Sequence, residues 1–138
     1  MIIETPERPK PRSHGQPEAK IQADSFRWFW ETFPQYRGLL FAVTNQNERS
    51  GDIGKKAQLI SGAMRKALGL IAGVSDLILM IPRSGFHGLC LECKTSIGRQ
   101  SPQQKEWETK VTEQGYLYRI FRSKEEFQQI IEWYLNLK

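Results

Sequence analysis

Long apolar runs are absent from this 138-residue sequence. No stretch reaches the roughly 18 consecutive apolar residues that a membrane-spanning helix needs, so none is predicted. The first residues, from Met1 to Pro6, have neither a basic start nor an apolar centre, so no secretory signal peptide is predicted either. These two absences lead us to expect a cytoplasmic protein.

Side chains that bind soft metals are also scarce. The sequence has two cysteines, Cys90 and Cys93, and two histidines, His14 and His87. A structural zinc site takes four ligands, and there is no second cysteine pair. Residues three apart on a strand also point to opposite faces. The Cys-x-x-C spacing therefore favours two reduced thiols packed on a strand over a zinc or redox site.

A strong excess of either charge is missing as well. Twenty Lys and Arg residues stand against 15 Asp and Glu residues, which gives a formal net charge of +5 and a pI near 9.4. The hydrophobic and charged fractions, 39% and 25%, are ordinary for a globular protein. The length predicts one compact domain. A moderately basic balance favours a polyanionic partner without identifying one.

The two ends of the chain differ in pattern. Residues 1–17 hold four prolines among basic residues and show no apolar period, so we predict a flexible basic leader that is solvated or lies along a phosphate backbone. Residues 18–138 are predicted to form the domain.

Within that domain, hydrophobic periods and capping residues predict an alternation of helices and strands. Ser101 and Ser123 each open a capping-box pattern, which marks the start of a helix. The sequence predicts an α/β fold with a small mixed β-sheet flanked by helices. In chain order the predicted elements are a helix over 17–33, a strand at 39–43, a helix over 54–68, a hairpin of strands at 73–80 and 88–94, a helix from 102, a strand at 116–121 and a helix from 124.

Three polar residues of the predicted hairpin point to a shared chemistry. Glu92 and Lys94 are two apart on one strand and therefore face the same way, and Asp76 can join them from the partner strand. Grouped carboxylates are costly unless something binds them. The simplest explanation of this grouping is a divalent cation that the carboxylate oxygens bind beside the lysine. The alternative is an exposed ion pair worth under about 1 kcal/mol, with Asp76 as a turn residue.

An aspartate, a hairpin and then Glu-x-Lys resembles the PD-(D/E)xK nuclease superfamily. The run Gly98-Arg99-Gln100-Ser101-Pro102-Gln103-Gln104-Lys105-Glu106-Trp107, followed by Gly115-Tyr116, resembles the VRR-NUC nucleases, which occur as stand-alone phage and bacterial proteins. The resemblance covers roughly residues 18–135. It implies a restriction-endonuclease-like core and a site that hydrolyses phosphodiester bonds with Mg²⁺ or Mn²⁺.

The resemblance also implies further site residues. Glu18 matches a glutamate on the first helix that completes the acidic cluster, and Gln104 matches a glutamine near the site. The alternatives are a helix-terminal charge for Glu18 and a simple capping residue for Gln104. The carbonyl of Cys93 is a candidate third metal ligand. We assign the catalytic role to Asp76, Glu92, Lys94 and Gln104, the metal to Glu18, Asp76, Glu92 and Cys93, and nucleic-acid contacts to Arg49, Lys55, Lys56 and Arg99.

The predicted function is a metal-dependent DNA endonuclease. The family resemblance associates it with branched DNA such as four-way junctions or flaps, with DNA repair, and with a homodimer in a bacterial or phage-infected cell. Trp28, Trp30 and Tyr36 could form the dimer face or belong to the core. The main alternative is a non-catalytic nucleic-acid-binding module on the same fold. A third is a protein-interaction domain whose basic charge is incidental.

Overall fold

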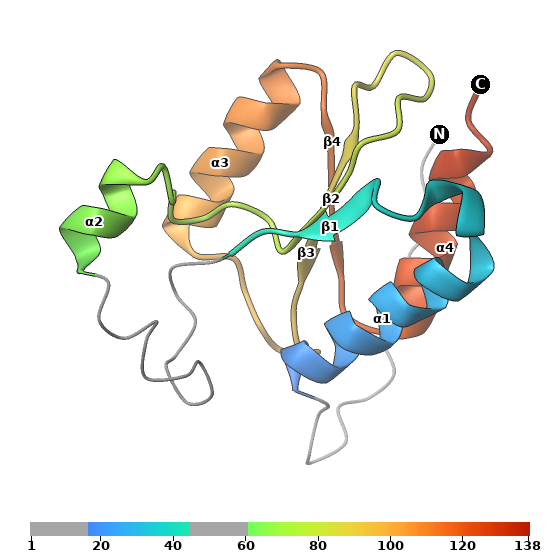
Figure 1. Ribbon diagram of the computed structural model, residues 1–138, viewed down its shortest axis with the longest axis horizontal. Helices are drawn as coiled ribbons and strands as arrows, with labels where there is room; N and C mark the ends of the chain where they lie inside the picture. The colour runs from blue at the N-terminus through green and yellow to red at the C-terminus, as the bar shows by residue number, and fades with distance from the viewer. Residues whose placement is uncertain (1–16, 45–60) are drawn as a thin grey trace.

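The computed structural model describes residues 17–44 and 61–138, and these residues follow the predicted order of helices and strands (Figure 1). The α/β fold with a small mixed sheet is confirmed. The elements are α1 (Glu18–Thr32), a short 3₁₀ helix η1 (Pro34–Tyr36), β1 (Leu40–Ala42), α2 (Gly62–Ala67), β2 (Leu77–Leu79), β3 (Leu89–Cys93), α3 (Pro102–Glu113), β4 (Leu117–Phe121) and α4 (Lys124–Leu135).

The described strands form a four-stranded sheet in the order β1-β2-β3-β4. β1, β2 and β3 pair antiparallel, and β4 runs parallel to β3. Figure 1 shows the sheet nearly edge-on, with α3 on one side and α1 and α4 on the other. The sheet is therefore covered on both faces, which agrees with the complete burial of β3.

Alternation along β3 separates two environments. Leu89, Leu91 and Cys93 belong to the apolar core with α1 and α4. The intervening residues Cys90 and Glu92 face the α3 side, where Gln104 contacts Glu92. The two cysteines are buried, unpaired and on opposite faces, as their spacing predicted.

Helices α1 and α4 close the core. Ile21, Ser25 and Phe29 form the buried stripe of α1, at the four-residue spacing of one helix face. The buried stripe of α4 runs from Phe127 to Tyr134, and the Tyr134 hydroxyl donates to the carbonyl of Ile81 at 2.6 Å. Helix α1 ends at Thr32 as predicted, because Pro34 disfavours helical backbone at Phe33.

The second predicted helix, over 54–68, does not run continuously through Ser61. Ser61 has extended backbone and accepts a hydrogen bond from the Met64 amide, so the helix begins at Gly62. Residues 54–60, where the prediction began, lie outside the described residues. Its large apolar side chains do not reach the core, since Met64 is 53% and Leu68 63% exposed. The predicted stop at Gly69 is confirmed by its positive φ of 83°.

Both predicted helix starts at the C-terminal end of the domain are confirmed. The Ser101 hydroxyl accepts from the Gln104 amide, and the Gln104 side chain accepts from the Ser101 amide, which completes a capping box on α3. The Ser123 hydroxyl caps α4 by accepting from the Glu126 amide. None of the described helices is long and apolar enough to cross a membrane.

The predicted leader falls almost entirely in residues 1–16, and Arg49, Lys55 and Lys56 fall in 45–60. All of these lie outside the described residues. The predictions about them stay predictions.

Candidate active site

The structure brings Asp76, Glu92 and Lys94 together at one end of the sheet. The register that pairs Leu77 with Leu91 sets Asp76 opposite Glu92. Oδ2 of Asp76 accepts a hydrogen bond from the Cys93 amide at 2.7 Å. The Lys94 ammonium lies 3.8 Å from Oε1 of Glu92. The predicted grouping of these three side chains on adjacent strands is therefore present.

Hydrogen bonds of the residues around Asp76 fix its position at the start of β2. The Asp76 carbonyl accepts from the Val43 amide at 2.9 Å, which ties the residue to β1. The preceding Ser75 is fully buried, and its hydroxyl donates to the Leu77 carbonyl. These contacts fix the entry into β2, so the Asp76 carboxylate is aimed along the sheet toward β3.

Glu92 is the most confined member of the site. It is 2% exposed, and its Oε1 accepts from the Gln104 side-chain amide at 2.8 Å. Since the Gln104 carbonyl oxygen is bound to the Ser101 amide, the capping box of α3 fixes the orientation of the amide that contacts Glu92. Oε2 of Glu92 is buried and has no hydrogen-bond partner among the described residues.

A buried carboxylate oxygen without a hydrogen-bond partner is costly when the group is ionised, and this cost appears in the pKa values of Glu92 and Asp76. Burial, followed by the charge of Asp76, raises the pKa of Glu92 to about 9. Burial also raises the pKa of Asp76. Without added positive charge, the site disfavours two ionised carboxylates side by side. A proton or a bound cation supplies that charge.

The residues present fit a hard divalent cation. Two carboxylates meet, one with an orphaned buried oxygen, and Mg²⁺ and Mn²⁺ prefer carboxylate, carbonyl and water oxygens. Within the described residues, no three His, Cys, Asp or Glu side chains form a group that could hold a metal ion. Side chains alone therefore do not complete the shell. The predicted Cys93 carbonyl and water would have to contribute.

Glu18, the predicted fourth ligand, opens α1 and is exposed. Its carbonyl accepts from the Cys93 thiol at 3.4 Å, which holds the start of α1 against the end of β3. Its charge contributes to the raised pKa of both Asp76 and Glu92. Glu18 is thus close enough to add negative potential to the pair, and its role as a ligand stays a prediction.

Arg99 is exposed in the connection between β3 and α3, so it is open to a partner. Sequence reasoning missed Arg122, whose guanidinium binds the backbone of that same connection. No motif singles this arginine out, because its partners are carbonyl oxygens far away in sequence. Only the folded chain reveals the contact.

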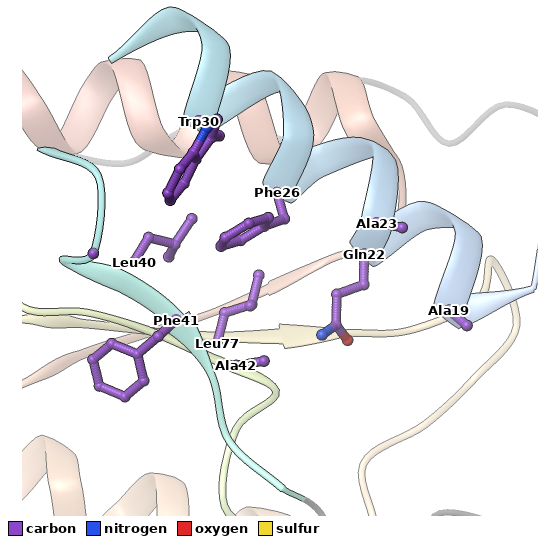
Figure 2. A pocket seen from close by; sticks show the side chains of 10 residues that line it. Ala19, Gln22, Ala23, Phe26, Trp30, Leu40, Phe41, Ala42 and Leu77 are labelled. Atoms are coloured by element: carbon purple, nitrogen blue, oxygen red, sulfur yellow. The ribbon is translucent and has the colours of Figure 1, made fainter. Parts of the chain in front are cut away.

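An apolar groove of about 550 Å³ lies between α1 and β1 (Figure 2). Its lining includes Gln22, Phe26, Trp30 and Phe41 and no acidic or histidine side chain, so it is not the candidate active site. Of the three aromatics considered for a dimer face, Trp30 is 42% exposed. Trp28 and Tyr36 are partly buried and pack against the core, so the core alternative holds for them.

Comparisons with known proteins bear on the family and the fold. The sequence profile described as "VRR-NUC domain" matches residues 21–125. A solved structure titled "VRR_NUC domain protein" superposes with a TM-score of 0.71 at 23% sequence identity, over 90% of this chain and 92% of that one. No curated protein sequence matches. The acidic pair lies inside the residues that the profile matches.

Proposed function

The chain belongs to the VRR-NUC family of nuclease domains, and from that premise we propose that it is a metal-dependent endodeoxyribonuclease. The observation that carries the proposal is the buried, orphaned Oε2 of Glu92 beside Asp76 and Lys94. Such a site is unfavourable as an isolated group of charges and becomes favourable around a cation. Hydrolysis of a phosphodiester bond is a use that such a cation and a lysine serve together.

In this proposal Asp76 and Glu92 hold Mg²⁺ or Mn²⁺, with the Cys93 carbonyl and Glu18 as further oxygen ligands. When bound, the cation lowers the pKa of water and neutralises phosphate oxygens. Gln104 orients the Glu92 carboxylate through its 2.8 Å hydrogen bond. The Lys94 ammonium, held beside Glu92, positions the attacking water and stabilises the negative charge that develops on the phosphate.

The proposed substrate is DNA with a branch, such as a four-way junction or a flap, cut by a homodimer. A four-way junction has two-fold symmetry, so two symmetric incisions are most simply made by two copies. Exposed apolar surface around Trp30 and the groove between α1 and β1 offers a place for the second copy. The net charge of +5 favours binding to a polyanion.

Two substitutions test this function on labelled duplex, flap and four-way-junction DNA with Mg²⁺, Mn²⁺ or EDTA. We expect cutting that requires metal, and Lys94→Ala should lower its rate by about a hundredfold or more because one charged group near the reacting phosphate is lost. Glu92→Gln should abolish cutting and leave DNA binding equal or tighter, since it removes a negative charge that faces phosphate.

The same assay separates the alternatives. Binding at low salt without cutting by the wild-type protein would favour a non-catalytic nucleic-acid-binding module. Cutting by the Lys94→Ala variant at an undiminished rate would remove the mechanism. Absence of binding at low salt would favour a protein-interaction domain.

A further inference from the structure

Ile97 is 77% exposed, more than any other large apolar side chain in residues 17–44 and 61–138. A single exposed apolar side chain is common on protein surfaces and by itself indicates nothing. Ile97 differs in two respects: the backbone that carries it is firmly held, and it lies next to the candidate active site.

The turn that carries Ile97 spans residues 95–98 and is closed by internal hydrogen bonds. The Gly98 amide donates to the Thr95 carbonyl at 3.2 Å and to the Thr95 hydroxyl at 3.0 Å. Nη1 of Arg122 donates to the carbonyls of Thr95 and Gly98, at 2.7 Å each. One guanidinium nitrogen thus joins both ends of the turn, and hydrogen bonds from a charged donor are the stronger kind.

The turn also packs directly against the site. A Cβ added to Gly98 would lie 3.0 Å from the Thr95 hydroxyl and 3.5 Å from Cδ of Lys94. Little room therefore remains between the turn and the lysine side chain. Arg99, two residues beyond Ile97 in the chain, is exposed and adds a positive charge to this connection. The result is an exposed apolar tip on a hydrogen-bonded turn, flanked along the chain by Lys94 and Arg99, with Lys94 beside Glu92.

We propose that Ile97 inserts into a gap in the base stack of the DNA at the cleavage step and is the residue that selects DNA with such a gap. This inference rests on the proposed nuclease function and defines its substrate class: duplex DNA whose stacking is interrupted by a branch, flap or nick. Arg99 and Lys94 contact the phosphates on either side of the inserted side chain.

The physical reason is a difference in cost between two substrates. Inserting an apolar side chain into continuous duplex requires unstacking a base step, which costs a few kcal/mol. At a branch or nick the step is already interrupted, so the contact is gained without that cost. A rigid tip gains most, because its conformational entropy is already lost in the free protein. Ile97 therefore increases activity on interrupted DNA and contributes little on continuous duplex.

The test compares a flap substrate with a continuous duplex of the same sequence. We expect Ile97→Ser to lower kcat/KM on the flap about tenfold while leaving the duplex rate within about twofold, since only the flap gains the contact. Ile97→Leu should keep the wild-type preference because an apolar tip is retained. Met80→Ser is the matched control. Met80 is also an exposed apolar residue, at 61%, but it follows the last residue of β2, whereas Asp76 precedes the first.

A second readout uses binding without cutting. In the Glu92→Gln background, Ile97→Ser should reduce the preference for flap over duplex about tenfold, and Met80→Ser should not change it. An unchanged preference, an equal loss on both substrates, or a loss of self-association caused by Ile97→Ser would overturn the inference. Wild-type cutting of DNA with no flap preference would also overturn it while leaving the nuclease function intact. Absence of cutting by the wild type would instead refute the proposed function.

Discussion

Glu92 is a buried acid in which one carboxylate oxygen is hydrogen-bonded and the other is not. Gln104 binds Oε1, whereas Oε2 has no partner among the described residues. A structural carboxylate buried this deeply ordinarily has all its hydrogen bonds made. Either a proton shared with the neighbouring Asp76 carboxyl group or a bound cation would satisfy this oxygen, and the proposed function assigns it to a cation.

This environment predicts a pH-dependent stability. The folded pKa of Glu92, about 9, lies above its ordinary value of 4.5, so its stabilising contribution is full below the ordinary value and is lost as the pH rises toward about 9. Glu92→Gln stays neutral and keeps an acceptor for Gln104. Without metal, we expect this variant to exceed the wild type in free energy of unfolding by at least about 2 kcal/mol at roughly pH 8, and the difference to shrink as the pH falls toward 4.5.

Urea unfolding with a chelator measures both proteins. Added Mg²⁺ should stabilise the wild type alone and close the difference near pH 8, because only the wild type retains both carboxylates. A stability difference that is independent of pH would contradict the assigned environment of Glu92.

At the scale of elements, the N-terminus of α3 has two tasks. Its capping box stabilises the helix, and the same Gln104 side chain reaches Glu92. Ser101→Ala and Gln104→Ala each break the box and should each cost about 1 kcal/mol in the free energy of unfolding. Gln104→Ala also leaves Glu92 unoriented, so we expect it to lower kcat at least about tenfold, with Ser101→Ala within about twofold of wild type. Equal loss of activity in both variants would mean that Gln104 acts only as a cap.

A second element-scale prediction concerns the loop before β2. Gly73 has a φ of 90°, and an added Cβ would clash with the Gln103 carbonyl oxygen at the start of α3. Gly69 has a similar φ of 83° but no atom within 4 Å of an added Cβ. Gly69→Ala should therefore cost about 1 kcal/mol through backbone strain alone. Gly73→Ala should cost about 3 kcal/mol, because the clash adds to the strain.

Thermal or urea unfolding of these two variants measures the difference. Since Gly73 contacts the turn of α3 that carries Gln104, the more destabilised variant should also be less active per folded molecule. Similar stabilities for the two variants would show that the loop and α3 can separate without cost.

The elements that the sequence predicted correctly are those with local signals. Ser101 and Ser123 begin helices whose caps are closed within four residues, and Phe33-Pro34 ends α1 through a local steric effect. The helix predicted over 54–68 is interrupted at Ser61, because apolar periodicity does not reveal that Ser61 has extended backbone or that Met64 and Leu68 are exposed. Periodicity predicts an amphipathic helix, but it does not predict whether another element packs against the apolar face.

At the scale of the whole molecule, the sheet joins distant segments into one site. Alternation along β3 was enough to predict that Glu92 and Lys94 share a face with Asp76, because strand geometry fixes that face. The Arg122 contacts to the 95–98 turn and the orphaned Oε2 of Glu92 could not be predicted, since both depend on packing between β3, β4 and α3. The sequence thus predicted which residues meet, and the fold supplied their environment.

The central claim is that Asp76 and Glu92 hold a divalent cation beside Lys94. A crystal soaked in Mn²⁺ and measured at the manganese absorption edge tests it directly. The account predicts an anomalous peak within coordinating distance of both carboxylates, on the Oε2 side of Glu92, that is lost in a Glu92→Gln crystal. A peak elsewhere on the protein, or none at these carboxylates in the wild type, would contradict it.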